Sequence, residues 1–347
     1  MSHNNNAYDL LRLLLALFVL FSHAYFLTNT GLDPLATFSK GQVYFAEIGV
    51  LGFFALSGYL ITSSIENMPN AFRFLYKRFL RLFPGYWVCL IVTGFIIAPA
   101  IYYFNNHTIN GFSFTGSNSS VTFFLKNAFL AINQWSVGNV LDHSVYKESL
   151  NGSLWTLYSE ALCYVMTLVL SFFGLLNKNK SVFILLFLFV YVVYAVNLYN
   201  APQFGPTFLT LNAARKLYIA YMCGMGLYIF RDKIVIDKKG QLFILLLSVA
   251  LLKFGGFLLL APILIAVLCI LGFANFKVSL KYDISYGMYI YAFPIQQLVI
   301  TEWGNSLGFW GSILTCILLT SVLGFLSYVL VEKPFLKLKN VKFKAVG

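Results

Sequence analysis

Two ionisable residues interrupt the first long apolar segment of the chain, which runs from Tyr8 to about Leu27. Arg12 and His23 are separated by ten residues within it, a distance of about 16 Å along an α-helix. An apolar run of this length is typical of a membrane-spanning helix. Because a charged group inside such a helix is costly, it marks a functional site by default. The segment therefore predicts one helix with an arginine near one membrane face and a histidine in the opposite half.

A carboxylate and a second arginine are predicted at a membrane depth similar to that of the histidine. Glu160 follows the stretch NGSLWTLYS, and Arg215 lies in a later apolar segment. A histidine next to a carboxylate can accept a hydroxyl proton, because the carboxylate fixes the imidazole tautomer and stabilises the imidazolium. The same residues also suit a buried polar cluster that holds helices together. The residue types leave both interpretations open.

A basic and aromatic segment, RFLYKRFLRLFPGYW, occupies residues 73–87. Its residues Arg78 and Arg81 are three apart, so on a helix they share a face. Each guanidinium group can donate two parallel hydrogen bonds to a phosphate. The alternative is a basic loop that orients the chain in the membrane, next to an interfacial aromatic belt at Tyr86 and Trp87. From this segment alone, the orienting role is favoured.

The composition assigns these residues to a polytopic membrane protein. Of the 347 residues, 59% are hydrophobic and 10% are charged, whereas soluble domains carry about 25% charged residues. The mean hydropathy is +0.78. The net charge of +12 does not indicate nucleic-acid binding, because the basic residues lie in short loops between apolar segments, as the positive-inside rule describes.

We predict an all-α transmembrane bundle with about ten spans. The predicted spans are residues 8–27, 43–64, 86–104, 152–175, 181–199, 207–230, 240–253, 256–273, 282–301 and 308–330. Basic residues are concentrated in the loops on one side, which predicts cytoplasmic N- and C-termini. Residues 105–151 form an outer loop too short for a separate catalytic domain, and residues 332–347 form a basic cytoplasmic tail. Residues 1–347 are therefore expected to form a single membrane domain.

Cysteine and glycine patterns predict packing rather than chemistry. All the cysteines lie in apolar segments and are expected to be small core residues; they are Cys89, Cys163, Cys223, Cys269 and Cys316. Since no residues stand at metal-ligand spacing in the sequence, we expect no metal. The second predicted span, GVLGFFALSGYLI, has small residues that permit close helix contact; they are Gly49, Gly52, Ser57 and Gly58.

Taken together, the motifs resemble the membrane acyltransferase-3 family. They are R-x10-H in the first span, FFxLSGYL in the second, R-x-x-R before the third, SLWTLxxE at the fourth and SYxxxEKP from Ser327 to Pro334. Each motif is short, and their order over nearly the whole chain makes the resemblance specific. In bacteria this family includes O-acetyltransferases that modify O-antigens and other envelope polysaccharides. The resemblance implies an enzyme that takes an acyl group, usually acetyl, from cytoplasmic acyl-CoA and delivers it to a hydroxyl group.

The resemblance also implies roles for individual residues. His23 matches the essential histidine of the family, Arg12 the basic residue before it, and Glu160 the acidic residue of the fourth span. Arg78 and Arg81 match the R-x-x-R pair. One departure is that many relatives carry a histidine before the proline of the ninth span, in a YLxHxP pattern. The corresponding stretch here, residues 291–294, reads YAFP, so mechanisms that need a second histidine there are not expected.

The resulting hypothesis is a bacterial inner-membrane O-acyltransferase with acetyl-CoA as its donor substrate and no permanently bound cofactor. The acceptor would be a cell-envelope polysaccharide or its undecaprenyl-linked precursor. His23 would act as the general base, or form a covalent acyl-histidine, and Glu160 would orient it. The expected site residues are His23 and Glu160 for catalysis, Arg12, Arg78 and Arg81 for acyl-CoA binding, and Arg215 and Trp155 in an acceptor pocket.

Two other classes of membrane protein fit the same polar residues. A transporter or flippase for lipid-linked sugars would also place polar residues at mid-membrane and would need no CoA site. A membrane glycan polymerase would use its long outer loop to contact lipid-linked sugars. Binding of acetyl-CoA by the purified protein distinguishes the acyltransferase from both.

Overall fold

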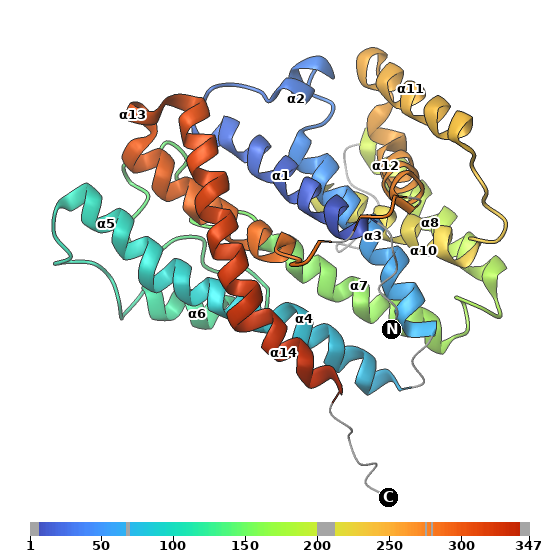
Figure 1. Ribbon diagram of the computed structural model, residues 1–347, viewed down its shortest axis with the longest axis horizontal. Helices are drawn as coiled ribbons and strands as arrows, with labels where there is room; N and C mark the ends of the chain where they lie inside the picture. The colour runs from blue at the N-terminus through green and yellow to red at the C-terminus, as the bar shows by residue number, and fades with distance from the viewer. Residues whose placement is uncertain (1–6, 67–69, 200–211, 275, 279, 341–347) are drawn as a thin grey trace, which may run out of the picture. The chain divides into compact units, whose positions relative to one another are not determined.

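The computed structural model describes residues 7–66, 70–199, 212–274, 276–278 and 280–340, and its regular structure over these ranges is helical (Figure 1). The predicted all-α fold is thereby confirmed. The helices are α1 (Tyr8–Leu27), α2 (Pro34–Phe38), α3 (Phe45–Glu66), α4 (Ala71–Val92), η1 (Thr93–Ile97), α5 (Ala98–Asn106), α6 (Ser120–Asn127), α7 (Trp155–Phe172), α8 (Lys180–Tyr199), α10 (Asn212–Ile229), α11 (Lys238–Phe254), α12 (Phe257–Ala274), α13 (Ser285–Ser327), η2 (Tyr328–Glu332), α14 (Lys333–Lys337) and η3 (Leu338–Asn340).

Seven helical segments in the described part of the chain are long and apolar enough to cross a membrane. Two of them are much longer than the roughly 20 residues that one crossing requires. Residues 71–106 form a continuous helical segment of 36 residues, and residues 285–337 form a segment of 53 residues that is interrupted by a kink at Gly308. The helices α10 and α11 coincide with two further predicted spans, although residues 207–211 of the prediction lie outside the described residues. The chain is therefore a multi-pass membrane protein.

The R-x-x-R segment is helical, and its helix begins well before the predicted span at residue 86. Helix α4 begins at Ala71, where the side chain of Asn70 accepts a hydrogen bond from the backbone N–H of Arg73 at 3.2 Å. Such a cap satisfies one of the N–H groups that the first turn leaves without a helical partner. The helix then continues through η1 and α5 to Asn106. Arg78 and Arg81 therefore lie on one continuous membrane helix.

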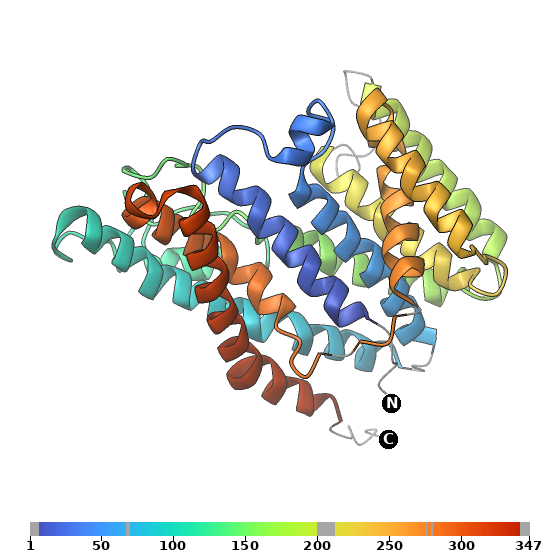
Figure 2. The same ribbon diagram turned by 45° about the horizontal axis from the view of Figure 1, so that its top comes forward.

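The last two predicted spans form the two arms of helix α13. The arms meet at Gly308, whose backbone is not helical (φ 66°, ψ −179°), a conformation that glycine adopts with little steric cost. A Cβ atom added to Gly287 on the first arm would lie 2.6 Å from the Cα atom of Gly324 on the second. The two arms therefore pack against each other as separate helices (Figures 1 and 2).

The chain divides into two compact units by its contacts. The first unit comprises residues 1–22, 31–69 and 159–281, and the second comprises residues 23–30, 70–158 and 282–347. In the first unit, α3 and α10 are in backbone contact, since a Cβ atom on Gly58 would collide with the carbonyl of Tyr221. A Cβ atom on Gly49 would lie 2.7 Å from the carbonyl oxygen of Leu15 in α1. The predicted close contact at these small residues is confirmed.

In the second unit, the loop of residues 105–151 is anchored by polar side chains. Tyr86 and Trp87 of α4 donate hydrogen bonds to the carbonyl oxygens of Asn127 and Ala128, at 2.6 and 2.8 Å. Gln297 of α13 donates from Nε2 to the carbonyl oxygen of Ser149 at 2.7 Å. The loop is thereby fixed to two membrane helices. The predicted tail at 332–347 begins at Glu332, the last residue of η2, and continues through α14 and η3; its residues 341–347 lie outside the described residues.

Candidate active site

His23 lies in a pocket of aromatic rings in the second unit. It is 9% exposed, and its ring packs edge-on against Phe26 and Phe293, with centroids 5.2 and 5.1 Å away. Tyr146 of the loop at residues 105–151 completes the pocket, with its ring centroid 5.9 Å from that of Phe293. We call His23, Phe26, Tyr146 and Phe293 the aromatic pocket. Burial, followed by the charge of Glu148, raises the pKa of Tyr146 above its ordinary value, so its hydroxyl group stays protonated.

The imidazole of His23 has a buried nitrogen that makes no hydrogen bond to the part of the chain that the structure describes. Within the described residues, its Nδ1 atom is buried and has no hydrogen-bond partner. Leaving a buried polar atom without a partner costs about 1–3 kcal/mol, so a purely structural histidine would be expected to bond there. A neutral imidazole has one donor and one acceptor nitrogen. His23 can therefore bond to, or accept a proton from, a group that the protein does not itself provide.

The ring of Phe293 is positioned by a proline and by the loop before α7. Pro294 has no N–H group, so the carbonyl of Ile290 loses its helical donor. Asn151 replaces that donor, because its Nδ2 atom donates to the Ile290 oxygen at 2.9 Å. A Cβ atom on the adjacent Gly152 would lie 2.7 Å from the Phe293 ring. The motif NGS thus holds this part of α13 and leaves room for the ring that packs against His23.

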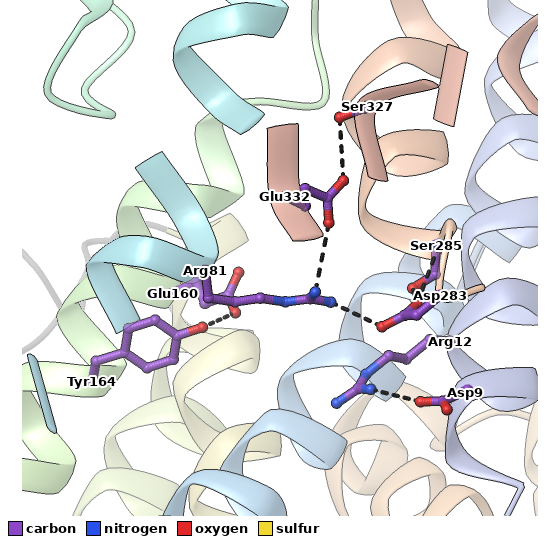
Figure 3. A network of polar contacts seen from close by, with 9 residues as sticks. All are labelled: Asp9, Arg12, Arg81, Glu160, Tyr164, Asp283, Ser285, Ser327 and Glu332. Atoms are coloured by element: carbon purple, nitrogen blue, oxygen red, sulfur yellow. Dashed lines mark hydrogen bonds and ion pairs between the residues drawn. The ribbon is translucent and has the colours of Figure 1, made fainter. Parts of the chain in front are cut away.

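The second member of the R-x-x-R pair is held by two carboxylates (Figure 3). The Nη2 atom of Arg81 lies 3.0 Å from Oδ2 of Asp283, and its Nη1 atom lies 3.5 Å from Oε2 of Glu332. Ser285 donates to Asp283 at 2.5 Å, and Ser327 donates to Glu332 at 3.2 Å. We call these five residues the arginine network.

Glu332 reaches this network because the helix widens locally. Residues Tyr328–Glu332 form a π-helical turn, and Glu332 is 1% exposed. Such turns often occur at functional sites. Gly85 of α4 faces the same region, since a Cβ atom there would lie 2.8 Å from the Tyr286 ring and 3.6 Å from the Cγ atom of Glu332. The closing motif SYxxxEKP therefore provides a buried partner for the R-x-x-R motif.

The other predicted site residues have the following surroundings. In the second unit, Arg78 lies over the ring of Phe74, 5.6 Å from its centroid, and Trp155 is the first residue of α7. In the first unit, Arg12 pairs with Asp9 at 3.1 Å and Glu160 accepts a hydrogen bond from Tyr164 (Figure 3). Arg215 of α10 is 3% exposed, and its buried Nη1 atom has no hydrogen-bond partner within the described residues.

The structure brings some of the predicted residues together and leaves other pairings as predictions. Arg78 and Arg81 share α4, as their spacing predicts. His23 belongs to the second unit, whereas Glu160 and Arg215 belong to the first. The orientation of His23 by Glu160 therefore stays a prediction, as does a common phosphate site of Arg12 with the R-x-x-R pair.

Sequence reasoning missed the residues that support this site. Asp283 and Glu332 were not assigned to Arg81, and Asn151 was not connected to Ile290. Two sequence signals point to them. A glutamate inside a largely apolar stretch requires a cationic partner, and a proline inside an apolar helix leaves one carbonyl group that another donor must satisfy. Neither signal identifies which residue pairs with the glutamate or donates to the open carbonyl group.

Comparison with known proteins shows the family. Residues 5–331 match the acyltransferase domain of the acyltransferase-3 family, so the chain belongs to that family and is a multi-pass membrane acyltransferase. It is 30% identical over 348 residues to the O-acetyl transferase of Shigella phage Sf6, covering 98% of each chain. It is 26% identical over 366 residues to nodulation protein 10 of Rhizobium leguminosarum bv. viciae, covering 97% of this chain and 95% of that protein. No solved structure matches the chain.

Proposed function

We propose that this protein is an inner-membrane O-acetyltransferase. It would transfer an acetyl group from cytoplasmic acetyl-CoA to a hydroxyl group of a cell-envelope polysaccharide or its lipid-linked precursor. The observation that carries the proposal is the buried His23 with its Nδ1 atom left without a partner in the described structure. The family match and the similarity to an enzyme named as an O-acetyl transferase support the same reaction.

His23 is the general base of the proposed reaction. It accepts the proton of the acceptor hydroxyl while that oxygen attacks the thioester carbonyl carbon. The C–O bond forms, the C–S bond breaks, and the CoA sulfur leaves and takes up the proton from the imidazolium. The aromatic pocket limits access of water, which favours transfer to the acceptor over hydrolysis of the thioester. Glu160 is proposed to orient the imidazole.

The donor is proposed to bind through its phosphates at the cytoplasmic end of α4. Arg78 contacts the phosphates directly, because a guanidinium group matches phosphate geometry. Arg81 shares its charge with Asp283 and Glu332, so its main contribution is to hold this end of the site in place. Arg12 is a further phosphate contact, and Arg215 and Trp155 belong to the acceptor side.

The test uses purified protein in lipid nanodiscs. It should bind acetyl-CoA and transfer a labelled acetyl group to envelope glycan, and glycan from cells lacking the protein should lose that acetyl group in mass spectrometry. A protein that folds but does not bind acetyl-CoA would contradict the proposal and favour the transporter or the polymerase.

The proposed orientation has a separate test. In a background without native cysteines, a cysteine at the exposed position Ser117 of the outer loop should react with an impermeant reagent added outside the cell. A cysteine at the exposed position Lys238 should not react. Labelling at position 238 but not at position 117 would contradict the orientation, because the proposed donor site would then face the outside of the cell, away from cytoplasmic acetyl-CoA.

A further inference from the structure

The first unit has an apolar groove that the proposed reaction does not use. It has a volume of about 220 Å³ and lies between α8, α10 and α12. Of these helices, α10 packs against both of the others (Figure 2). Its lining includes Phe183, Phe187, Met222, Cys223 and Gly226, with Phe230 at one end. An apolar cavity of about 150 Å³ is already large enough to hold benzene. The groove therefore has room for part of a hydrocarbon chain.

A small polar recess of about 60 Å³ adjoins the groove and is lined in part by Asn177, Lys180 and Arg231. Lys180 connects the two, because its Nζ atom donates to the carbonyl oxygen of Ile229 at 3.1 Å and lies 5.9 Å from the centroid of the Phe230 ring. An ammonium group has three donors and a guanidinium group has five. Lys180 and Arg231 are both exposed, so they can bond to a ligand at the mouth of the groove.

Helix α8, which contributes to the groove, also carries exposed apolar side chains. Leu185, Phe189 and Val192 are 67%, 58% and 57% exposed, which fits a helix face that contacts lipid chains in a membrane protein. Lys180 is the first residue of α8, and Arg231 follows the last turn of α10. Lipid headgroups are found near the ends of membrane helices. Clusters of Lys and Arg at this level attract anionic lipids.

We propose that the groove and recess form a binding site for an anionic phospholipid. One acyl chain fills the groove, and the lipid phosphate bonds to Lys180 and Arg231. Glu66 and Asp232 also line the recess, but Glu66 already accepts a hydrogen bond from Tyr228 and lies 3.7 Å from Arg231. Lys178 and Lys233 lie in the adjacent turns and keep the local charge positive.

Cys223 provides a direct probe, because it lines the groove and is half-buried, whereas the other four cysteines are buried. With those four replaced by alanine, the rate of Cys223 labelling by an apolar maleimide is measured in nanodiscs. Discs of phosphatidylcholine are compared with discs of phosphatidylcholine and phosphatidylglycerol in equal parts. The phosphatidylglycerol discs should slow labelling several-fold. Equal rates would overturn the recognition of an anionic headgroup.

Two pairs of variants test whether the slower labelling of Cys223 in phosphatidylglycerol discs arises from a lipid bound in the groove and recess. Lys180→Gln should remove the difference between the discs, whereas Lys253→Gln, an exposed lysine at the far end of α11, should keep it. Gly226→Leu should block labelling in both discs, because an added Cβ atom meets only Phe183, at 3.6 Å, and the side chain then fills the groove. Gly272→Leu, where a Cβ atom meets open space, is the matched control. Protection by acetyl-CoA in phosphatidylcholine discs would overturn the proposal by assigning the groove to the donor.

Discussion

The aromatic pocket and the arginine network belong to the same unit, yet they differ in whether the ionisable group at their centre has bonding partners within the protein. Arg81 has two carboxylate partners, and each carboxylate has a serine donor in turn. His23 is surrounded by rings, and its buried Nδ1 atom has no partner in the described structure. The guanidinium charge of Arg81 is paired inside the protein, whereas the Nδ1 atom of His23 is left available. Within the described residues, the buried Oε2 atom of Glu332 lies 3.5 Å from Arg81 but makes no hydrogen bond.

This difference separates the residues that hold the site from the residue that we propose as the base. Polar groups that satisfy one another fix the positions of the helices that carry them. A buried nitrogen without a partner is kept at a cost in stability, and such a cost is expected at functional sites. We therefore expect changes in the arginine network to affect stability first, and changes at His23 to affect acyl transfer first.

Replacing the histidine should give the largest effect. His23→Gln keeps a polar side chain but removes the base, so acetyl transfer should fall by roughly 10²–10⁴-fold. Acetyl-CoA affinity and thermal stability should change little, because the base is not a donor contact. His143→Gln, at an exposed position of the loop at residues 105–151, is the control. Near-normal transfer by His23→Gln would leave His23 a structural residue.

Replacing the buried glutamate should mainly lower stability. Glu332→Gln removes one charge from the network and leaves Arg81 incompletely paired, at a cost on the order of 3 kcal/mol in the free energy of unfolding. Thermal unfolding in detergent measures this loss, with the exposed Glu148→Gln as control. An unchanged unfolding temperature together with lost transfer would reverse the comparison, because Glu332 would then act in the reaction.

The two arginines of α4 should respond differently. Arg78→Ala should weaken acetyl-CoA binding by about 1–3 kcal/mol through the loss of charge-assisted hydrogen bonds, without a matching loss of stability. Arg81→Ala should lower stability as well, because it leaves Asp283 and Glu332 without their cation. Calorimetric titration and thermal unfolding are compared, with the exposed Arg73→Ala as control. Unchanged affinity in Arg78→Ala would leave this arginine with an orienting role only.

The smallest effect is expected at the wall of the aromatic pocket. Phe293→Leu removes the edge-on ring contact with His23, a contact worth about 0.5–1.5 kcal/mol, so transfer should fall about 2- to 10-fold. Hydrolysis of acetyl-CoA without transfer should rise at the same time, because more water reaches the site. Phe335→Leu, at an exposed ring, is the control. If hydrolysis and transfer fall in proportion, the ring positions His23 without excluding water.

The membrane fold and much of the list of candidate residues could be predicted from the amino-acid sequence alone. Apolar runs of membrane-crossing length are a local property, so α1, α3 and α8 could be placed from the sequence within a few residues. The small residues of α3 predicted a close helix contact. His23 and Arg12 could be predicted as candidate site residues because they are ionisable residues in an apolar run. The beginning of α4 was not predicted well, because its basic residues resemble a loop when hydropathy alone is considered.

Which of these residues come into contact depends on the tertiary structure. Arg81 and Glu332 are far apart in the chain, as are Asn151 and Ile290, and no periodicity within one helix encodes their contacts. The same is true of Phe293, which packs against His23 from the opposite end of the sequence. The partner of a buried polar group depends on how whole helices pack and on where proline and π-helical turns leave the backbone open. The sequence indicates that a buried polar group needs a bonding partner, and the packing of the helices determines which residue that partner is.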